Sequence, residues 1–237
     1  MSLPAVTAVI PVRMSDVCHA DGTPKVLLGG RPLWTYTIEA AVQSSSLKRI
    51  IVAADDARFY DHLTPYPRLE HPVVRPPHLS ASDRTTLDVL AYVSASLGEG
   101  GDTPDYYMLL EITHPVRPDA IIDRLIEIVA GNAYDSVFTA YVASYNYWYE
   151  TEEGDFARVQ VKSGHTRSPM YQEMIGLASL FRPALLKTDD PYGPKVGIVP
   201  IKRLEGLIDA RDENGLWLAE QYLARRASRD SQETRKR

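Results

Sequence analysis

The chain has 237 residues, of which 44% are hydrophobic and 24% charged, and its formal net charge at pH 7 is -5. These proportions are ordinary for a soluble globular protein, and the length suits one large domain or two small ones. A surface for nucleic acid or for an anionic membrane usually needs a concentrated basic face, so the acidic balance argues against both partners. Any site for phosphate groups must therefore be local.

The only cysteine is Cys18, which excludes an internal disulfide framework and a multi-cysteine metal site. The apolar run at residues 5–10 has no basic segment before it. It is also too short for a signal core or a membrane span. We therefore interpret this run as a core strand and expect a cytoplasmic protein.

The segment from residue 5 to residue 41 has the pattern of a strand, a loop and a helix. The apolar run Ala5–Ile10 is followed by a polar loop that contains Arg13 and Lys25, and a helical pattern covers Leu33–Val42. In an open α/β sheet, ligands bind beyond the carboxyl ends of the strands, and helix N-termini attract anions. Two cations in this loop suit a triphosphate. The alternative is that both are solvated, because the loop lacks the spacing of a P-loop or of a dinucleotide site.

Strands and helices alternate along most of the chain. Lys48–Ala53 is a β-branched run typical of a buried parallel strand, and Tyr106–Ile112 is the most apolar strand candidate, which we place at the centre of the sheet. Residues 64–79 are rich in proline and are expected to be irregular. The alternation predicts an α/β fold with a mixed, mostly parallel sheet. We expect strands at residues 5–10, 48–53, 106–112, 136–142, 175–181 and 196–200, and helices at 33–42, 58–63, 85–97, 118–131 and 216–226.

The pattern changes between residues 144 and 170. The aromatic run Tyr147–Tyr149 precedes a Glu-Gly-Asp turn at Glu153–Asp155, which predicts a β-hairpin. Aromatic side chains on a hairpin more often pack or form a subunit interface than stack on bases. No linker or repeat divides the chain, so we predict one domain over residues 1–228 and a disordered, polar tail at 229–237.

Several motifs in a fixed order carry a resemblance to a known family. IPVR at residues 10–13 and LLGGRPLWTYTIEAA at 27–41 are similar to an IPAR loop and a LLGGKPLIAYTIEAA-like helix in the acylneuraminate cytidylyltransferase (CMP-sialic acid synthetase) family. These enzymes belong to the cytidylyltransferases that activate 3-deoxy sugar acids. The further motifs are RPPHLSASDRTTLDVL from Arg75, LLEITHPVRPDAIID from Leu109, DSVFTAYV from Asp135, YQEMIGLASLFRPALL from Tyr171 and IDARDENGLWLAEQYL from Ile208.

The resemblance implies a Rossmann-like nucleotidyltransferase fold of three α/β/α layers, with a small β-hairpin extension at residues 144–170 that serves for dimerisation. It implies transfer of CMP from CTP to a 3-deoxy-2-keto sugar acid of the sialic-acid type, with release of pyrophosphate and with Mg²⁺ as cofactor. The expected partners are CTP, a sugar acid and a second copy of the chain. Two alternatives stay open: a related sugar nucleotidyltransferase with another base or acceptor, and a non-catalytic nucleotide-binding homologue.

The resemblance also implies which residues form the nucleotide site. By position in the motifs, Arg13 and Lys25 meet the phosphates and take part in catalysis, while Arg75, Ser80 and Glu111 border the cytidine. Glu111 stands where the family usually has a glutamine. An ionised carboxylate accepts a hydrogen bond from the cytosine amino group but cannot donate one to the ring carbonyl. The inference of nucleotide binding is therefore stronger than that of a cytosine preference.

The metal and acceptor sites follow from the same motifs. Asp209 matches a carboxylate that helps to hold magnesium and is expected to be catalytic, and Asp212 is a possible substitute. The alternative for Asp212 is a charge at a helix N-terminus. Magnesium needs few protein ligands when water and phosphate oxygens complete its shell. The residues left to bind the acidic sugar are Arg167, Tyr171 and Gln172. His114 is also placed for this pocket, because it follows a central strand, although a loop histidine is as often solvated.

Overall fold

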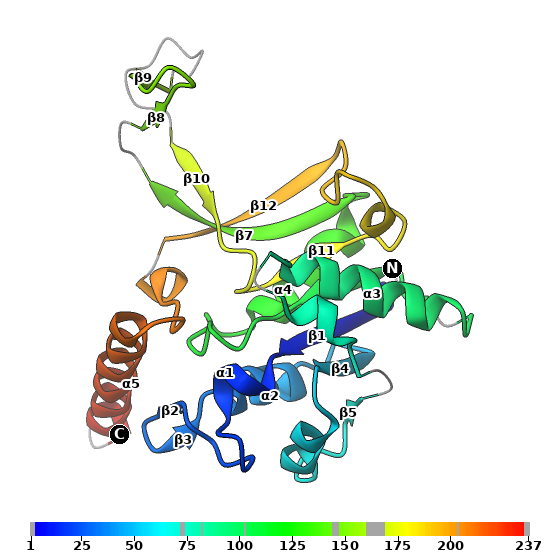
Figure 1. Ribbon diagram of the computed structural model, residues 1–237. Coiled ribbons are helices and arrows are strands. Elements are labelled where there is room, and N and C mark those ends of the chain that lie inside the picture. The colour runs from blue at the N-terminus through cyan, green and yellow to red at the C-terminus, as the bar shows by residue number, and fades with distance from the viewer. Residues whose placement is uncertain are drawn as a thin grey trace.

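The centre of the molecule is a mixed sheet of eight strands (Figure 1), seen in a computed structural model. The strands are β1 (Val6–Val12), β4 (Arg49–Ala54), β5 (Leu69–Glu70), β6 (Tyr106–Leu109), β7 (Ser136–Ala143), β10 (Met170–Glu173), β11 (Ser179–Phe181) and β12 (Val196–Ile201). Their order is β10, β7, β11, β6, β1, β4 and β5, and β7 also pairs with β12. The structure describes residues 3–71, 74–81, 83–101, 103–143, 147–159, 169–202 and 204–234.

Strand β1 is the middle of the parallel part of the sheet. It pairs in parallel with β4 on one side and with β6 on the other, and all seven of its residues are buried. The pairs β4–β5 and β7–β12 are parallel too, whereas β10 and β11 run antiparallel to their neighbours. The predicted mixed, mostly parallel sheet is therefore confirmed. The carboxyl ends of β1, β4 and β6 lie along one edge.

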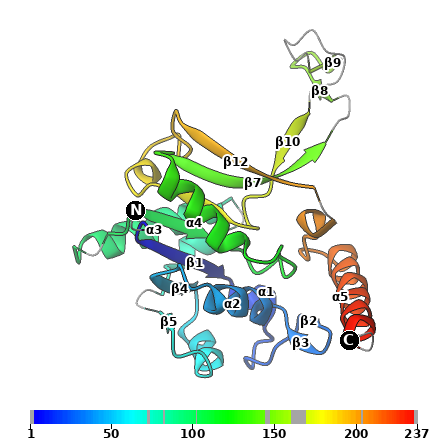
Figure 2. The ribbon, with the colours of Figure 1, turned by 180° about the vertical axis from the view of Figure 1, so that it is seen from behind.

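Helices cover both faces of this sheet. On one face α2 and α4 pack against β1, where Ile38 and Leu125 share a core with Ile10 (Figure 2). On the other face α3 packs with Val89 and Leu90 beside Val9 (Figure 1). The arrangement is the predicted α/β/α sandwich. The α-helices are α1 (Met14–Val17), α2 (Trp34–Gln43), α3 (Thr86–Gly98), α4 (Ile121–Gly131) and α5 (Glu213–Thr234), and the 3₁₀ helices are η1 (Ala57–Leu63), η2 (Pro77–Ser80), η3 (Leu185–Lys187) and η4 (Leu204–Leu207).

The helix starts follow from local sequence chemistry. Thr85 and Asp88 form a capping box at the start of α3, each side chain bonding the other residue's backbone N–H, which satisfies donors that the helix itself leaves unpaired. In α4 the apolar residues recur on one face and are buried, because that spacing places them on the side that meets the sheet.

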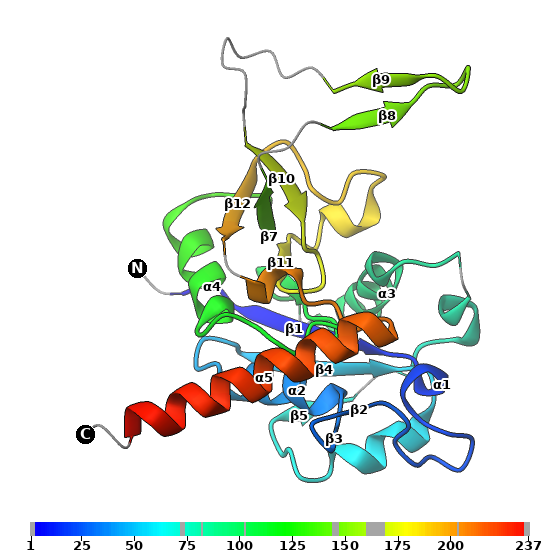
Figure 3. The ribbon, with the colours of Figure 1, turned by 90° about the vertical axis from the view of Figure 1, so that its left-hand side faces the viewer.

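Two short ribbons lie outside the main sheet. β2 (Leu27–Leu28) pairs with β3 (Arg31–Pro32), and β8 (Trp148–Glu150) pairs with β9 (Phe156–Arg158). The β8–β9 hairpin stands away from the sheet (Figures 1 and 3) and leaves Trp148 60%, Tyr149 56% and Phe156 71% exposed. The hairpin predicted from the aromatic run is therefore present.

The strand expected at Ile175–Phe181 is shorter than predicted. Only Ser179–Phe181 is extended and paired as β11, because residues 175–177 form a turn closed by the bond from Leu177 N to Met174 O, 3.0 Å. The backbone carbonyls of Gly176 and Leu177 accept hydrogen bonds from Arg117 instead of from a strand. The prediction of a continuous strand was wrong at its start.

Helix α5 is longer than the sequence indicated. It runs from Glu213 to Thr234, so it extends past the expected end at Arg226 into residues 229–234 of the predicted tail. The helix crosses the molecule in front of the central sheet (Figure 3). Among the residues that the structure describes, no helix is both long and apolar enough to cross a membrane.

Candidate active site

Three side chains follow the carboxyl ends of neighbouring parallel strands. Arg13 comes directly after β1, Asp55 after β4, and Glu111 shortly after β6. Since these strands are adjacent, the three residues converge on one edge of the sheet, which is where ligands bind in folds of this class. The sequence placed Arg13 and Glu111 at this edge but did not single out Asp55.

A cavity of about 460 Å³ opens at this edge. Its walls come from the loop after β1, the residues after β6 and the start of α5. Of the predicted site residues, it brings together Arg13, Arg75, Glu111 and Asp212. The cavity is lined by Pro11, Arg13, Asp16, Val17, Val26, Leu33, Arg75, Thr86, Glu111, Ile112, Thr113, Ala210, Arg211, Asp212, Glu213 and Leu216.

Arg13 is held only loosely by its neighbours. Its Nη2 donates to Ala81 O over 3.4 Å, and its Nη1 lies 3.8 Å from the carboxylate of Asp16. Its Nε is buried and has no hydrogen-bond partner among the described residues. A buried donor without a partner is costly, so this guanidinium is suited to bind an anionic oxygen in the cavity.

Asp55 supports the cavity from behind, because it contacts Arg75 but does not itself line the cavity. Its carboxylate accepts from Met14 N–H at 2.8 Å and from Ser80 Oγ at 2.8 Å, and it lies 3.6 Å from Nη2 of Arg75. Arg75 is buried, and burial lowers the pKa of its guanidinium while Asp55 opposes the shift. Ser80 therefore supports the site through Asp55 and is not among the residues that line the cavity.

Glu111 presents a buried carboxylate to the cavity. Its Oε1 accepts from Thr86 Oγ1 at 2.8 Å, and its Oε2 lies 3.4 Å from both Thr113 Oγ1 and Nη2 of Arg211. These partners are all donors. They stabilise an acceptor-only carboxylate, which is the form that can accept from an amino group of a ligand.

Arg117 fixes the backbone behind Glu111. Its fully buried guanidinium donates to the carbonyl oxygens of Glu111 at 2.7 Å, Gly176 at 3.1 Å and Leu177 at 2.8 Å. Burial lowers the pKa of Arg117 to about 9, so the side chain stays charged near pH 7. It ties the turn before β11 to the loop after β6.

His114 is a buried, neutral side chain. Its ring nitrogen Nδ1 lies 3.3 Å from Thr113 Oγ1. Burial, with a smaller contribution from Arg117 and Arg211, lowers the pKa of its imidazole from 6.5 to about 3. His114 does not line the cavity, so the structure gives no direct contact for the acceptor role that the motif implied.

Lys25 lies beside a neighbouring cavity of about 470 Å³ that also contains Asp55 and Arg58. Its Nζ donates to the carbonyl of Ser15. The loop between β1 and β2 folds into the short helix α1 and a bridge between Cys18 and Pro24, which separates Lys25 from Arg13. The structure therefore does not bring the two predicted phosphate-binding cations into one cavity.

Asp209 and Asp212 both precede α5, which begins at Glu213. Asp209 Oδ2 lies 3.2 Å from Nη2 of Arg211, while its Oδ1 is buried and has no partner within the described part of the chain. Asp212 Oδ1 accepts from Gly215 N–H at 2.8 Å, as a helix N-cap does. The bonding of Asp212 thus matches the helix-terminus alternative.

A magnesium ion fits Asp209 better than Asp212, because an orphaned carboxylate oxygen is what a hard cation requires. The described residues contain no group of three or more His, Cys, Asp or Glu side chains placed to hold a metal. Most ligands of a magnesium ion at Asp209 would therefore come from phosphate oxygens and water.

The predicted acceptor residues are not gathered at this cavity. Tyr171 and Gln172 are exposed on β10, and neither lines the cavity. Arg167 lies outside the described residues. These assignments stay predictions.

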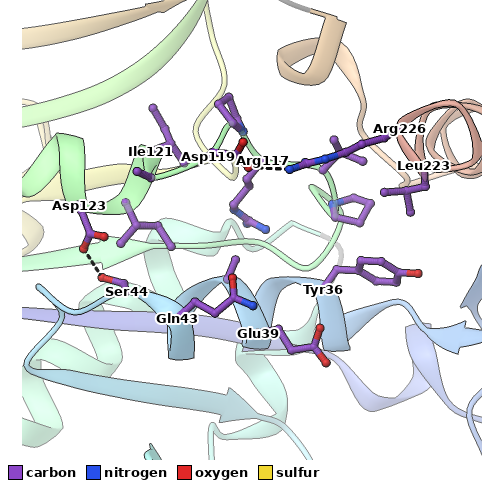
Figure 4. A pocket seen from close by; sticks show the side chains of 16 residues that line it. Tyr36, Glu39, Gln43, Ser44, Arg117, Asp119, Ile121, Asp123, Leu223 and Arg226 are labelled. Atoms are coloured by element: carbon purple, nitrogen blue, oxygen red, sulfur yellow. Dashed lines mark hydrogen bonds and ion pairs between the residues drawn. The ribbon is translucent and has the colours of Figure 1, made fainter. Parts of the chain in front are cut away.

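Another cavity, of about 450 Å³, lies between α2, α5 and the loop before α4. Figure 4 shows the ion pair between Arg226 and Asp119, 2.8 Å, and the hydrogen bond from Ser44 Oγ to Asp123, 2.6 Å, on its wall. Volume does not distinguish this cavity from the one at the strand ends. None of the residues predicted to bind nucleotide, acceptor or metal lines it.

Comparison with known families shows the family of the chain. A family model described as Cytidylyltransferase matches residues 24–165, which is more than half of the chain. The chain belongs to the cytidylyltransferase family. This confirms the broader prediction of a nucleotidyltransferase, while assignment of this cytidylyltransferase to the acylneuraminate branch stays a prediction. A search of curated proteins found no significant match.

Solved structures of cytidylyltransferases share the fold. A 4-diphosphocytidyl-2C-methyl-D-erythritol synthase superposes with a TM-score of 0.67 at 16% identity, covering 94% of this chain and 100% of the other. The corresponding enzyme from Anaerococcus prevotii DSM 20548 has a TM-score of 0.64 at 14% identity, with coverages of 93% and 99%. A CMP:2-keto-3-deoxy-manno-octonic acid synthetase complexed with CTP has a TM-score of 0.64 at 13% identity, with coverages of 94% and 99%.

Sequence reasoning missed several residues in and behind the cavity. Asp55, which lies behind it and contacts Arg75, had a usable signal, because it closes a predicted parallel strand next to the first one. For Thr86 and Thr113 the sequence carried no signal of a role in the site beyond their place in the family motifs. Arg211 lies inside the motif that supplied Asp209, but its side chain could not be oriented without the structure.

Proposed function

We propose that the protein transfers CMP from CTP to a 3-deoxy-2-keto sugar acid of the sialic-acid type and releases pyrophosphate. The single observation that carries the proposal is the cavity at the strand ends, which Arg13, Arg75 and Glu111 line together. Cations for a polyphosphate and an acceptor for a base amino group are thereby combined in one space. Membership of the cytidylyltransferase family supports the same reaction class.

In the proposed reaction, the anomeric hydroxyl oxygen of the acid attacks the α-phosphorus of CTP. The new P–O bond forms as the bond to the β-phosphate bridging oxygen breaks, the hydroxyl proton leaves to solvent, and pyrophosphate departs. Such transfers depend mainly on positioning and electrostatics. Arg13, whose Nε lacks a partner in the described structure, offsets charge on the phosphates, and no nucleophile on the protein is needed.

Magnesium, if bound, would be held by Asp209 through its unpartnered Oδ1 and would supply positive charge to the phosphates. For Lys25, the proposed contact with the phosphates requires its side chain to leave the carbonyl of Ser15. The flexible stem of a lysine permits such a change.

The base is proposed to be read at Glu111. Its carboxylate accepts from the exocyclic amino group of cytosine, while Thr86 and Thr113 hold it in place. Arg75 lines the same cavity, and Ser80 supports Arg75 from behind through Asp55. The acidic acceptor is proposed to approach from β10, where Tyr171 and Gln172 are exposed.

The β8–β9 hairpin is proposed to form a homodimer contact. Trp148, Tyr149 and Phe156 are each more than half exposed on it, and large apolar side chains grouped on a projecting ribbon are typical of an interface. Light scattering coupled to gel filtration tests this, with Trp148→Ser expected to shift the dimer towards monomer. A parent chain that is monomeric at micromolar concentration contradicts the dimer.

The proposed reaction is tested by pyrophosphate release. The purified protein is incubated with Mg²⁺, with each of the four common nucleoside triphosphates, and with a panel of sialic, legionaminic, pseudaminic and octulosonic acids. Release with CTP and one acid, together with detection of the CMP conjugate by mass spectrometry, is the expected result. Release only with another triphosphate contradicts the proposed base.

A second candidate is a cytidylyltransferase with a sugar phosphate as acceptor. It is favoured because the chain superposes about equally well on the methylerythritol enzyme and on the octonic acid enzyme. The names of these two enzymes indicate different acceptors. Adding sugar phosphates to the panel separates the two candidates. Binding of CTP without release with any acceptor favours a non-catalytic nucleotide-binding homologue.

A further inference from the structure

Arg211 stands on one wall of the strand-end cavity, between two carboxylates. Its Nη2 lies 3.4 Å from Oε2 of Glu111 and 3.2 Å from Oδ2 of Asp209. The Arg211 side chain is 67% exposed, whereas that of Glu111 is 11% exposed. The guanidinium is therefore anchored at one nitrogen, and its remaining donors face the cavity and solvent.

This arrangement differs from two forked arginine ion pairs elsewhere in the fold. Arg49 holds Glu70 with Nε 3.1 Å from both carboxylate oxygens and Nη2 2.5 Å from one. Arg58 engages Asp56 in the same forked manner. Strong charge-assisted bonds to arginine are short and frequently bidentate. The Arg211 contacts are longer and use a single nitrogen.

The part of the cavity wall formed by the start of α5 is mostly acidic. An anion can bind beside it only if a cation there offsets the carboxylates. The segment at the start of α5 contributes Arg211, Asp212 and Glu213 to the cavity lining, and Glu111 and Asp209 lie next to Arg211. Among the described lining residues on this wall, Arg211 is the only cation. Without it, these carboxylates would repel a polyphosphate held by Arg13, which lines the same cavity.

We propose that Arg211 is a phosphate-binding residue that donates its Nε and Nη1 hydrogens to the bound nucleoside triphosphate while Nη2 stays near Asp209. The planar fork of a guanidinium matches two phosphate oxygens. The inference rests on the proposed function only in taking a nucleoside triphosphate as the ligand. Arg13 and Arg211, which line the same cavity, then hold the triphosphate together.

The test is equilibrium binding by isothermal titration calorimetry on the full chain, with CTP and inorganic triphosphate as probes and cytidine as a phosphate-free reference followed by NMR. Arg211→Ala is expected to weaken CTP and triphosphate binding by about tenfold to a hundredfold, and to leave cytidine binding unchanged. Arg211→Lys should recover part of the loss. The matched control is Arg226→Ala, which removes the same charge from the far part of α5, and it should behave as the parent.

Circular dichroism melts check that each variant folds. Equal affinity of the parent and Arg211→Ala for both probes overturns the proposal. If Arg211→Ala also has a raised KM for the acidic acceptor while its CTP affinity is unchanged, Arg211 binds the acceptor carboxylate instead. If the parent binds inorganic triphosphate but not CTP, the proposed function fails while the triphosphate comparison still decides the role of Arg211. No binding of either probe to the parent also overturns the proposal.

Discussion

The backbone of Gly176 lies directly against the carboxylate of Glu111. A Cβ added at residue 176 would be 2.5 Å from Oε2 of Glu111, closer than side chains approach one another. The carbonyl of Gly176 also accepts from Glu111 N–H at 2.8 Å and from Arg117 Nη2 at 3.1 Å. The turn before β11 thus sets both the backbone and the side chain of Glu111, and only glycine leaves room for the observed carboxylate position.

Gly176→Ala is therefore expected to displace the Glu111 side chain from Thr86 and to weaken CTP binding by about tenfold, the usual effect of losing a hydrogen bond to a charged group. Titration calorimetry measures the affinity, and a thermal melt measures stability. Gly131→Ala is the control, because nothing lies within 4 Å of an added Cβ there. CTP affinity equal to that of the parent would show that Glu111 does not contact the nucleotide.

Asp55→Asn should lower the free energy of unfolding by about 2 kcal/mol, because it leaves the buried guanidinium of Arg75 without its counter-charge. The two groups are 15% and 5% exposed, so solvent screens the pair little. Urea denaturation of parent and variant measures the difference. Asp56→Asn, at the next position, is the control, since its partner Arg58 is 62% exposed and an asparagine still caps η1. An equal effect of both substitutions contradicts a special role for Asp55.

The main sheet and its helices could be predicted from periodicity, because their residues are buried on one or both faces. β1, β4, β6 and β7, with α2, α3 and α4, all lie close to their predicted ranges. The start of β11 could not be predicted, because Arg117, which is distant in sequence, donates hydrogen bonds to the carbonyls of Gly176 and Leu177. The length of α5 was missed because a polar sequence suits both a solvated helix and a tail.

Both Arg13 and Glu111 were predicted correctly as residues of the cavity. Arg13 was predictable because it follows the first strand, whereas Glu111 lay inside the strand predicted at 106–112 and was assigned through the family resemblance. Lys25 was harder to place, because the intervening loop folds into α1 and orients Lys25 towards Ser15. Arg211 depends on how the segment before α5 packs across the sheet edge, and spacing in the sequence carries no information about that contact.

His114 should make stability depend on pH. Its pKa is about 3 in the folded protein against an ordinary value of 6.5, so the unfolded chain binds a proton between these values that the folded chain does not. As pH falls from 6.5 towards 3, this group alone lowers the free energy of unfolding by about 1.4 kcal/mol per pH unit. His114→Gln should flatten the pH profile of urea denaturation relative to the parent, and parallel profiles would show that the imidazole is protonated in the fold.

Asp209→Asn should remove most of the increase in CTP affinity that Mg²⁺ gives the parent, because Oδ1 of Asp209 is a carboxylate oxygen without a hydrogen-bond partner in the described structure and a neutral amide is a poor magnesium ligand. CTP titrations with and without Mg²⁺ measure this without requiring turnover. Asp212→Asn is the matched comparison: the amide oxygen can still cap α5 at Gly215, and only the charge is lost. If Asp212→Asn abolishes the magnesium effect and Asp209→Asn does not, the metal belongs to Asp212, and the cap must open when the nucleotide binds.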